Sequence, residues 1–415
     1  MTQSRKHLYF ILLVVLLEVV GFGIVIPIYP KLLIELGAVS LSQAAIIGGY
    51  LIFVFAIMQF IFGPIMGGLS DRYGRRPVIL ISLVAISLDY LLLVYAPNLW
   101  WLVIGRIIGG VAGSTITAAH AYVTDISSKD NRAKYFGMLG AAIGTGFILG
   151  PALGGVLGEI DVRMPFKVAA IFVAITAVFG YFLLPESLAE DKRRKFDIKR
   201  ANPLGTLRQM TKYKWVPILL AVMFFLEMAG QVYPSVWTFF TIERFSWTIK
   251  EVGYSLTAFG FLMAVVQGGL VAPISKAIGN KNTAYLGFFA TTTTMFIVGF
   301  ISQGWVLYAF LPLMAMGGLA GVGVRTILSL QVPDNAQGEL QGAITSIVSI
   351  VAFISPLIMT QIFGYFTSKD AYVYLPGAPF IAAACFACIA ATLFWLGSKA
   401  SDKTKQVTET IMENG

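Results

Sequence analysis

Long apolar stretches follow one another along almost the whole chain, separated by short polar segments. A helix of about 20 apolar residues spans the hydrocarbon core of a bilayer, which is about 30 Å thick. Twelve stretches approach this length, and they cover residues 8–30, 45–66, 78–96, 100–124, 135–158, 166–185, 215–240, 252–274, 283–302, 305–330, 341–364 and 378–397. Because lipid offers no hydrogen bonds to the backbone, the sequence predicts an all-α integral membrane protein with 12 transmembrane helices.

The composition agrees with a membrane protein and argues against a soluble one. Of the 415 residues 57% are hydrophobic and 12% are charged, and the mean hydropathy is +0.79. The net charge of +9 does not indicate a nucleic-acid partner, because the basic residues lie between the apolar stretches rather than along one face. The first stretch runs from Leu8 to Ile28 without a small-residue cleavage site, so we expect it to be retained as a signal anchor.

Lys and Arg are distributed unevenly over the two sides that twelve spans would create. Short loops rich in these residues stay in the cytoplasm. Of the 30 Lys and Arg residues, Arg106 and Arg325 lie within spans. The remainder fall mostly on the side of the two termini, and the opposite side holds only Lys31, Arg163, Lys167, Arg244, Lys250 and Lys369. We therefore expect both termini to face the cytoplasm.

The longest polar interruption, residues 190–214, is dense in charge and contains Pro203-Leu204-Gly205. It predicts a cytoplasmic linker between an N-terminal six-helix half, residues 1–189, and a C-terminal half, residues 215–398. Residues 399–415 are polar and predict a loosely ordered cytoplasmic tail.

The two halves repeat one another. Leu17-Glu18-Val19-Val20-Gly21 recurs as Leu226-Glu227-Met228-Ala229-Gly230, and Gly109-Gly110-Val111-Ala112-Gly113 recurs as Gly317-Gly318-Leu319-Ala320-Gly321. Further matches in the same order are Gly137 with Gly342 and Pro151 with Pro356. Duplicated halves of this kind are typical of one large class of secondary transporter, built as two pseudo-symmetric six-helix bundles.

Three motifs resemble those of the major facilitator superfamily. Gly67 to Arg76, Gly-Gly-Leu-Ser-Asp-Arg-Tyr-Gly-Arg-Arg, resembles its loop 2–3 signature, and Arg106-Ile107-Ile108-Gly109-Gly110 is similar to its span-four arginine motif. Gly146-x-x-x-Gly150-Pro151-x-x-Gly154-Gly155 resembles the span-five signature of drug:proton antiporters. Within the superfamily, Ser87-Leu88-Asp89-Tyr90 and Ala121-Tyr122-Val123-Thr124-Asp125 are most similar to the tetracycline-efflux branch.

The resemblance implies a major facilitator fold and proton-coupled transport by alternating access in a bacterial inner membrane. The expected substrate is a drug or another small amphipathic compound, exported by a monomer that the proton gradient drives without a cofactor. A metabolite or siderophore transporter of the same fold, including an importer, is the alternative, and a channel or a non-transporting sensor is a more distant one. No P-loop, nucleophile motif or metal-ligand spacing points to an enzyme, and Cys385 and Cys388 lie in an apolar stretch without the surroundings of a redox site.

Ionisable residues within spans are costly, so they are candidates for the transport machinery. Glu18 and Glu227 each lie near the middle of a span, and Asp89 and Arg106 lie at similar depth on neighbouring spans, so we expect the last two to pair. Burial favours the protonated form of a carboxyl group and a nearby cation favours the ionised form. We predict proton coupling by Glu18, Asp89 and Glu227. The alternative for the two glutamates is a structurally satisfied buried acid, and the alternative for Asp89 is a fixed pair with Arg106 that holds spans three and four together.

Substrate contacts are expected from residues of other types. Arg106 can orient a carbonyl or an anionic group of the substrate, or act on the neighbouring acids. His120 can relay protons or serve as a hydrogen-bonded packing residue. Arg325 lies near the polar end of its span, where it can line the cavity or extend to the surface, and Gln231 and Tyr233 are uncharged hydrogen-bonding candidates.

A charged cluster is predicted to form a cytoplasmic gate. Asp71, Arg72 and Arg75 lie in the polar turn between spans two and three, where Gly74 lets the backbone reverse, and Asp125 lies at the end of span four. We expect Arg75 to bridge to Asp125, and Asp71 to accept bonds from the start of span eleven, near Glu339 to Gly342. Positive-inside retention alone is the alternative. The second-half counterpart around Gly279 keeps the glycine but not the acid.

The glycines at 146, 150, 154 and 155, together with Pro151, predict a close helix contact at the interface between the two halves. Two departures from the tetracycline branch argue against tetracycline as the substrate. The branch carries a span-nine aspartate and a span-eight histidine, whereas the matching positions here are Thr291 and Met263. We therefore expect Glu227 to act as the titrating acid of the second half.

Overall fold

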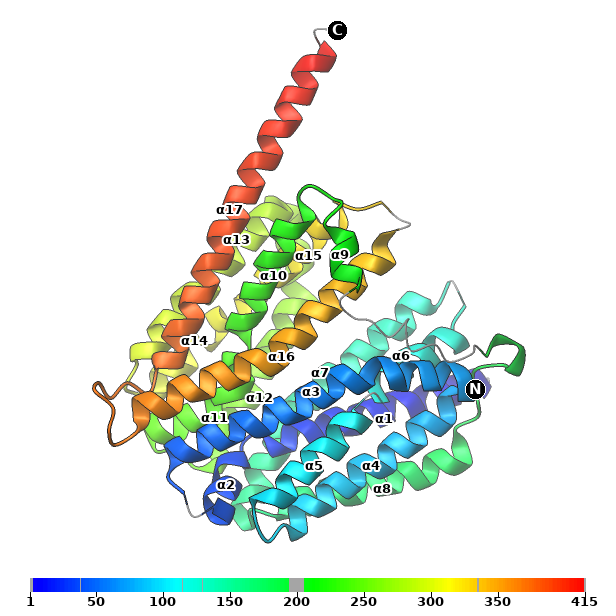
Figure 1. The fold of residues 1–415 in the computed structure, drawn as a ribbon, viewed down its shortest axis with the longest axis vertical. Helices are drawn as coiled ribbons and strands as arrows, with labels where there is room; N and C mark the ends of the chain where they lie inside the picture. Colours follow the sequence, from blue (N-terminus) through cyan, green and yellow to red (C-terminus); the bar gives the residue numbers. More distant parts are fainter. Residues whose placement is uncertain are drawn as a thin grey trace. The chain divides into compact units, whose positions relative to one another are not determined.

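The computed structural model describes residues 3–37, 39–113, 115–128, 130–193, 205–333 and 336–413. Within these ranges every regular element is a helix (Figure 1). In the described part of the chain, eleven helical stretches are long and apolar enough to cross a membrane. One of them, Ile249–Phe300, is 52 residues long and contains a non-helical residue, Gly279 with φ 79° and ψ 158°, that divides it into two spans. The predicted all-α architecture with 12 spans is confirmed.

The contacts divide the chain into two compact units. Unit 1 comprises Met1–Asn202, Pro234–Phe261 and Pro356–Tyr374, and unit 2 comprises Pro203–Tyr233, Leu262–Ser355 and Leu375–Gly415. Unit 1 thus contains the whole predicted N-terminal half and two segments of the predicted C-terminal half. The physical reason is that these segments pack on N-terminal spans: a Cβ at Gly48 would lie 3.2 Å from the ring of Phe239.

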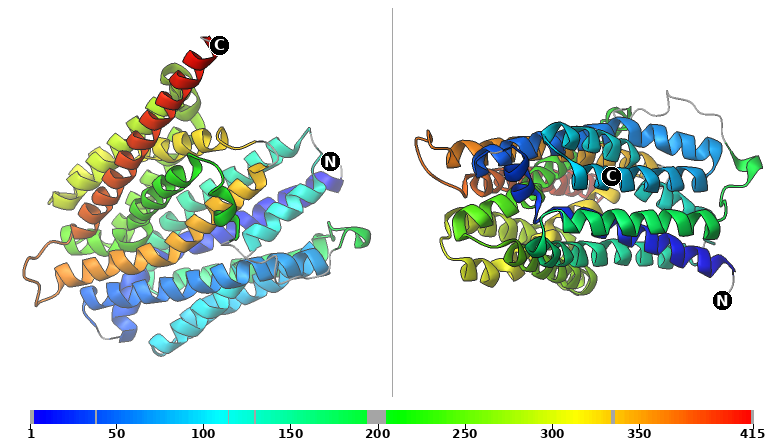
Figure 2. Two further views of the ribbon diagram at one scale, coloured as in Figure 1. Left: turned by 45° about the horizontal axis from the view of Figure 1, so that its top comes forward. Right: turned by 90° about the horizontal axis from the view of Figure 1, so that it is seen from below.

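Among the described residues, unit 1 contains eight α-helices of the N-terminal half: α1 (Gln3–Val25), α2 (Tyr29–Gly37), α3 (Leu41–Tyr73), α4 (Arg75–Tyr95), α5 (Leu99–Ala112), α6 (Thr115–Ile126), α7 (Arg132–Ile160) and α8 (Met164–Leu183). Figure 2 shows the long helices of this half running side by side, with the short α2 set across them at one end. The closest packing joins α1 to α7, α4 to α8, and α3 and α4 to α5. From the C-terminal half it adds α11 (Val232–Phe245), α12 (Ile249–Val265) through Phe261, and the end of α16 (Gln337–Thr367).

Unit 2 is built around α13 (Val271–Phe300), which packs on α14 (Gly304–Met316), α15 (Gly318–Ser329) and α17 (Ala378–Glu413). Helix α10 (Val216–Gly230) packs on α17 and α15, and the short α9 (Gly205–Met210) precedes it. A π-helical turn, Val266–Leu270, separates α12 from α13. Helix α17 continues to Glu413, so the polar residues from Ser401 to Glu413 are helical where we expected loose order. The linker residues 194–204 lie outside the described ranges.

Helix ends follow local sequence signals. Ser40 and Gln43 form a capping box at the start of α3, and the Asn98 side chain accepts the Trp100 N–H at the start of α5. The polar turn predicted between spans two and three, residues 67–77, is shorter than expected: α3 continues to Tyr73 and the chain reverses only at Gly74, with φ 105°. A positive φ of this size is accessible mainly to glycine, which explains the residue at this position.

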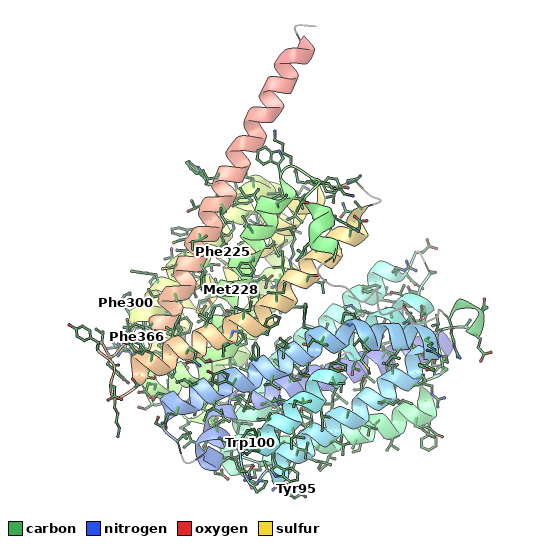
Figure 3. The ribbon with its side chains drawn as sticks, viewed as in Figure 1. Tyr95, Trp100, Phe225, Met228, Phe300 and Phe366 are labelled. Atoms are coloured by element: carbon green, nitrogen blue, oxygen red, sulfur yellow. The ribbon has the colours of Figure 1, made fainter. Side chains whose placement is uncertain are left out.

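Aromatic side chains mark the turn between α4 and α5. Tyr95 is 74% exposed and Trp100 is 75% exposed, and Figure 3 shows both at the same end of these helices. Amphipathic rings favour the headgroup level of a membrane, because one part of each ring is apolar and another bonds to water. This turn is therefore suited to a membrane–water interface.

Candidate functional site

Asp89 on α4 and Arg106 on α5 form a buried ion pair. The Arg106 Nη2 atom donates to Asp89 Oδ2 at 2.7 Å, and the side chains are only 12% and 5% exposed. Glycines make this contact possible, since a Cβ at Gly105 or at Gly109 would lie 2.5 Å from one of the Asp89 carboxylate oxygens. The Phe55 ring lies 5.5 Å from the guanidinium group. The pairing expected from the matching depths of the two residues is confirmed.

Several polar atoms near this pair are buried without a hydrogen-bond partner among the described residues. They include Oε2 of Glu18, Oη of Tyr29, Oδ1 of Asp89 and Nε of Arg106. Tyr90 lies close enough to interact electrostatically with Glu18, Asp89 and Arg106. Unsatisfied buried groups are costly and are uncommon in native proteins. Their concentration in one half indicates a site that can bind a proton or a polar ligand.

A second ion pair lies in unit 2, between Glu227 on α10 and Arg325 on α15. Arg325 Nη2 donates to Glu227 Oε1 at 2.9 Å, and the side chains are 52% and 25% exposed. Sequence reasoning expected Arg325 to line the cavity or extend to the surface and did not predict this partner. The two residues are 98 positions apart on helices that are not consecutive, and no local pattern connects them.

The other expected substrate contacts belong to both units. His120 is exposed on α6 in unit 1, with its ring 5.7 Å from that of Phe136. In unit 2, Gln231 ends α10 and donates its backbone N–H to the carbonyl of Glu227 at 3.1 Å. The Tyr233 ring lies 6.2 Å from the ring of Phe380. Within unit 2, Gln231 therefore adjoins the Glu227–Arg325 pair.

Three of the four predicted gate residues form a cluster in unit 1. Arg75 donates to Asp71 Oδ1 at 2.5 Å and to Asp125 Oδ2 at 3.2 Å, so the expected Arg75–Asp125 bridge is confirmed. We call Asp71, Arg75 and Asp125 the gate cluster. Arg72 instead lies over the Tyr73 ring, at 4.9 Å. The expected contact of Asp71 with the start of span eleven stays a prediction.

Sequence reasoning missed Glu186 and Ser187, which lie three and four residues after the end of α8. The Glu186 carboxylate accepts the backbone N–H groups of Arg75 and Arg76, at 2.8 and 3.2 Å. The Ser187 hydroxyl donates to Asp125 Oδ2 at 3.0 Å. The one available signal was an acid in a segment that ends a span, which is too common a pattern to indicate this role.

The glycine-rich stretch of α7 has a different role from the one predicted. A Cβ at Gly146 would lie 2.7 Å from Cβ of Val19, and one at Gly150 would lie 2.7 Å from Cα of Gly23. Gly154 likewise approaches the backbone of α1 next to Pro27. These glycines pack α7 against α1 within the N-terminal half, so placing them at the interface between halves was wrong.

Other positions of this stretch join the two predicted halves. A Cβ at Gly155 would lie 3.1 Å from Cα of Gly253 on α12, and one at Gly253 would lie 2.5 Å from the carbonyl oxygen of Pro151. Thr257 donates to the carbonyl of Ile148 at 3.2 Å. The close contact that we predicted between halves is therefore made by Gly155 and Pro151.

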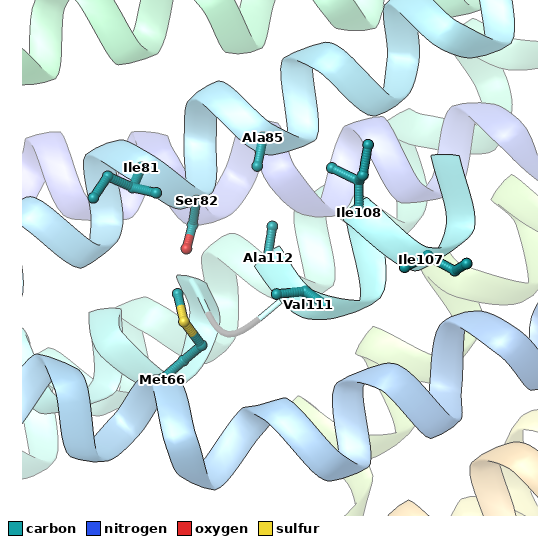
Figure 4. A pocket seen from close by; sticks show the side chains of 8 residues that line it. All are labelled: Met66, Ile81, Ser82, Ala85, Ile107, Ile108, Val111 and Ala112. Atoms are coloured by element: carbon teal, nitrogen blue, oxygen red, sulfur yellow. The ribbon is translucent and has the colours of Figure 1, made fainter. Parts of the chain in front are cut away.

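A small apolar pocket of about 230 Å³ lies between α3, α4 and α5 (Figure 4). It is lined by Met66, Ile81, Ser82, Ala85, Ile107, Ile108, Val111 and Ala112. None of the ionisable residues described above lines it. The pocket is therefore separate from the candidate site.

Comparisons with known proteins identify the family. The profile described as Major Facilitator Superfamily matches residues 11–356. The class C tetracycline resistance protein of Escherichia coli is 36% identical, over 87% of this chain and 90% of that protein. The class B protein of Escherichia coli is 34% identical, over 96% of this chain and 98% of that protein. Multidrug resistance protein 2 of Bacillus subtilis is 30% identical, over 74% of this chain and 78% of that protein.

Solved structures agree on the fold. A bacterial homolog of the human lysosomal transporter Spinster matches with a TM-score of 0.77 at 14% identity, over 96% of this chain and 97% of that chain. The human organic anion transporter MFSD10 matches with a TM-score of 0.69 at 22% identity, over 94% of this chain and 99% of that chain. The chain belongs to the Major Facilitator Superfamily and is a multi-pass membrane transporter rather than an enzyme.

Proposed function

We propose that this transporter couples export of a drug or other small amphipathic compound to proton entry across a bacterial inner membrane, with both termini in the cytoplasm. Similarity to tetracycline and multidrug resistance proteins supports the substrate class. Thr291 and Met263, at the positions where the tetracycline branch has an acid and a histidine, argue for a compound other than tetracycline.

The observation that carries proton coupling is the carboxyl group of Glu18. Its Oε2 atom is buried and has no hydrogen-bond partner among the described residues, and Tyr90 is its electrostatic neighbour. Burial in such surroundings costs a charged carboxylate much free energy, whereas the neutral carboxyl group is buried with little cost. Alternating access exposes the site to water first on one side of the membrane and then on the other. Glu18 can therefore take up a proton on one side and release it on the other.

Glu227 supplies the second acid of the proposed mechanism. Its partner Arg325 is half exposed, so a proton on Glu227 releases a cation that a polar or anionic group of the substrate can bind. We infer that Asp89, Arg106, His120, Gln231 and Tyr233 support these two acids as proton-handling or substrate-binding groups. The gate cluster closes the cytoplasmic side when its ion pairs form and opens it when they break.

A proteoliposome experiment tests the proposal. A purified monomer in vesicles with an imposed pH gradient should move protons when substrate is added, and Glu18→Gln and Glu227→Gln should each abolish that coupling. Candidates are chosen by thermal stabilisation of the protein with drugs, siderophores and small acids. Full coupled transport in both variants would refute the assignment of the acids.

A metabolite or siderophore transporter is the second candidate, favoured by the exposure of Arg325, which suits an anionic substrate. Inward uptake of a small acid in the same vesicles, without response to drugs, would select it. A channel or sensor would show no substrate-driven proton movement.

A further inference from the structure

We propose that Glu186 is a positioning residue of the gate cluster. Its carboxylate fixes the first turn of α4, and Arg75, the first residue of that helix, is thereby held between Asp71 and Asp125. The inference rests on the proposed function only in treating this cluster as a gate.

The start of α4 needs a partner from elsewhere in the chain. The first N–H groups of a helix have no acceptor within the helix. The residue before α4 is Gly74, which has no side chain to provide one. Glu186 does so from 111 positions away, with Oε1 accepting from the Arg75 N–H and Oε2 from the Arg76 N–H. A negative charge at a helix N-terminus is stabilising, so the carboxylate serves as the cap.

Gly74 leaves the space that the Glu186 carboxylate occupies. Its φ of 105° disfavours any other residue, and a Cβ at this position would collide with the Glu186 side chain. The close approach of carboxylate and backbone therefore depends on glycine for space as well as for conformation.

The residues around Glu186 are themselves fixed to the cluster. Ser187 donates to the same oxygen of Asp125 that accepts from Arg75. Glu186 also accepts the N–H of Leu188 at 3.0 Å, and the carbonyl of Pro185 accepts from the Tyr122 hydroxyl at 3.1 Å. Leu188 is buried. Segment 185–188 is thus a short rigid support that orients both sides of the Arg75–Asp125 bridge.

The second half of the chain provides an internal contrast. Gly279 is its counterpart of Gly74, with φ 79°, but a Cβ at Gly279 would meet no described residue within 4 Å. The turn between two spans can therefore form without a carboxylate behind it. The turn at Gly74 therefore does not require the contact with Glu186, which we assign to the gate cluster.

Two variants of Glu186 and one control test the proposal. Glu186→Ala removes the cap, and Glu186→Gln keeps the shape but loses the charge and one acceptor. Glu190→Gln is the matched control, because Glu190 lies just after segment 185–188, its side chain is 90% exposed and, among the described residues, that side chain pairs with Arg193 at 3.8 Å. Thermal unfolding establishes that each variant is folded. If Glu186→Ala does not fold, Glu186→Gln is used in its place.

Hydrogen exchange of the segment containing Arg75 and Arg76 is the direct measurement. Their exchange should be about tenfold faster in Glu186→Ala, less so in Glu186→Gln, and unchanged in Glu190→Gln. This measurement needs no substrate, so it stands even if transport by the wild-type protein is not found. Unchanged exchange in both Glu186 variants would overturn the proposal.

A double-variant comparison separates positioning from general support. Glu186→Ala should slow transport about tenfold with little change in KM, since it acts on gating rather than on substrate binding. In an Arg75→Ala background the same change should cost nothing further, because the group it positions is gone. An equal, additive loss in that background would overturn the positioning role.

Discussion

The two acid–arginine pairs differ in how much water reaches them. Asp89 and Arg106 are 5% and 12% exposed, whereas Glu227 and Arg325 are 25% and 52% exposed. The attraction between charges is stronger where solvent is excluded, and each charge of a buried pair depends on the other. An open pair separates at little cost. The first pair is therefore suited to holding its place, and the second to exchanging its partner for water or a substrate group.

The repeat makes the contrast more informative. In the first half the Asp89 carboxylate packs against Gly109. In the second half the Thr291 hydroxyl packs against Gly317, the repeat counterpart of Gly109. By the same offset, Met314 stands where the first half has Arg106. The second half thus has no charge at these two positions and carries its pair on α10 and α15 instead.

The largest effect is expected from breaking the buried pair. Asp89→Asn leaves the Arg106 charge uncompensated and should destabilise the protein by about 3–5 kcal/mol. The measurement is the thermal unfolding midpoint of the purified protein in detergent. Asp89→Asn combined with Arg106→Gln should recover much of the loss, and a double variant as unstable as the sum of both single variants would contradict this account.

An acid placed at Thr291 tests whether this position is equivalent to Asp89 of the first half. Thr291→Asp places a carboxyl group in a buried position without a cation and should cost about 2 kcal/mol. Adding Met314→Arg should regain part of that stability, because it supplies the counterpart of Arg106. Thermal unfolding of the two variants side by side checks this, and a double variant less stable than Thr291→Asp would argue against the equivalence of the two sites.

A smaller effect is expected from crowding the buried pair through its glycine. Gly109→Ala would bring a Cβ to 2.5 Å from Asp89 Oδ2 and should cost about 1–3 kcal/mol. Gly321→Ala is the control on α15, since its Cβ would meet no described residue within 4 Å, and it should change stability by less than about 0.5 kcal/mol. Equal midpoints for the two variants would show that the contact with Asp89 is not tight.

The smallest effect on stability is expected at the open pair. Glu227→Gln should lower stability by less than about 1 kcal/mol, and by still less at high salt, because the exposed charges are screened. Unfolding midpoints at low and high ionic strength measure both quantities. A loss as large as that of Asp89→Asn would mean that Glu227 is a structural residue rather than a working one.

Much of the architecture could be predicted because it depends on short windows of sequence. Hydropathy over about 20 residues gave the spans. Breaks within spans were not predicted: Gly113 separates α5 from α6, and Gln231 separates α10 from α11. Gly279 was expected as a turn residue, and its positive φ agrees with that expectation. The Asp89–Arg106 pair was predictable because its members lie on consecutive spans at matching depth.

What the sequence by itself determined is therefore the set of membrane helices, their duplication and the identity of the few charges among them, since hydropathy and glycine or proline conformation act locally. Which acid meets which base was decided by the tertiary structure. Glu227 finds Arg325 98 positions away, and Glu186 reaches the start of α4 from more than 100 positions away. The physical reason is that such contacts are set by how whole helices pack, and glycines that permit close packing do not specify in advance which helix will approach them.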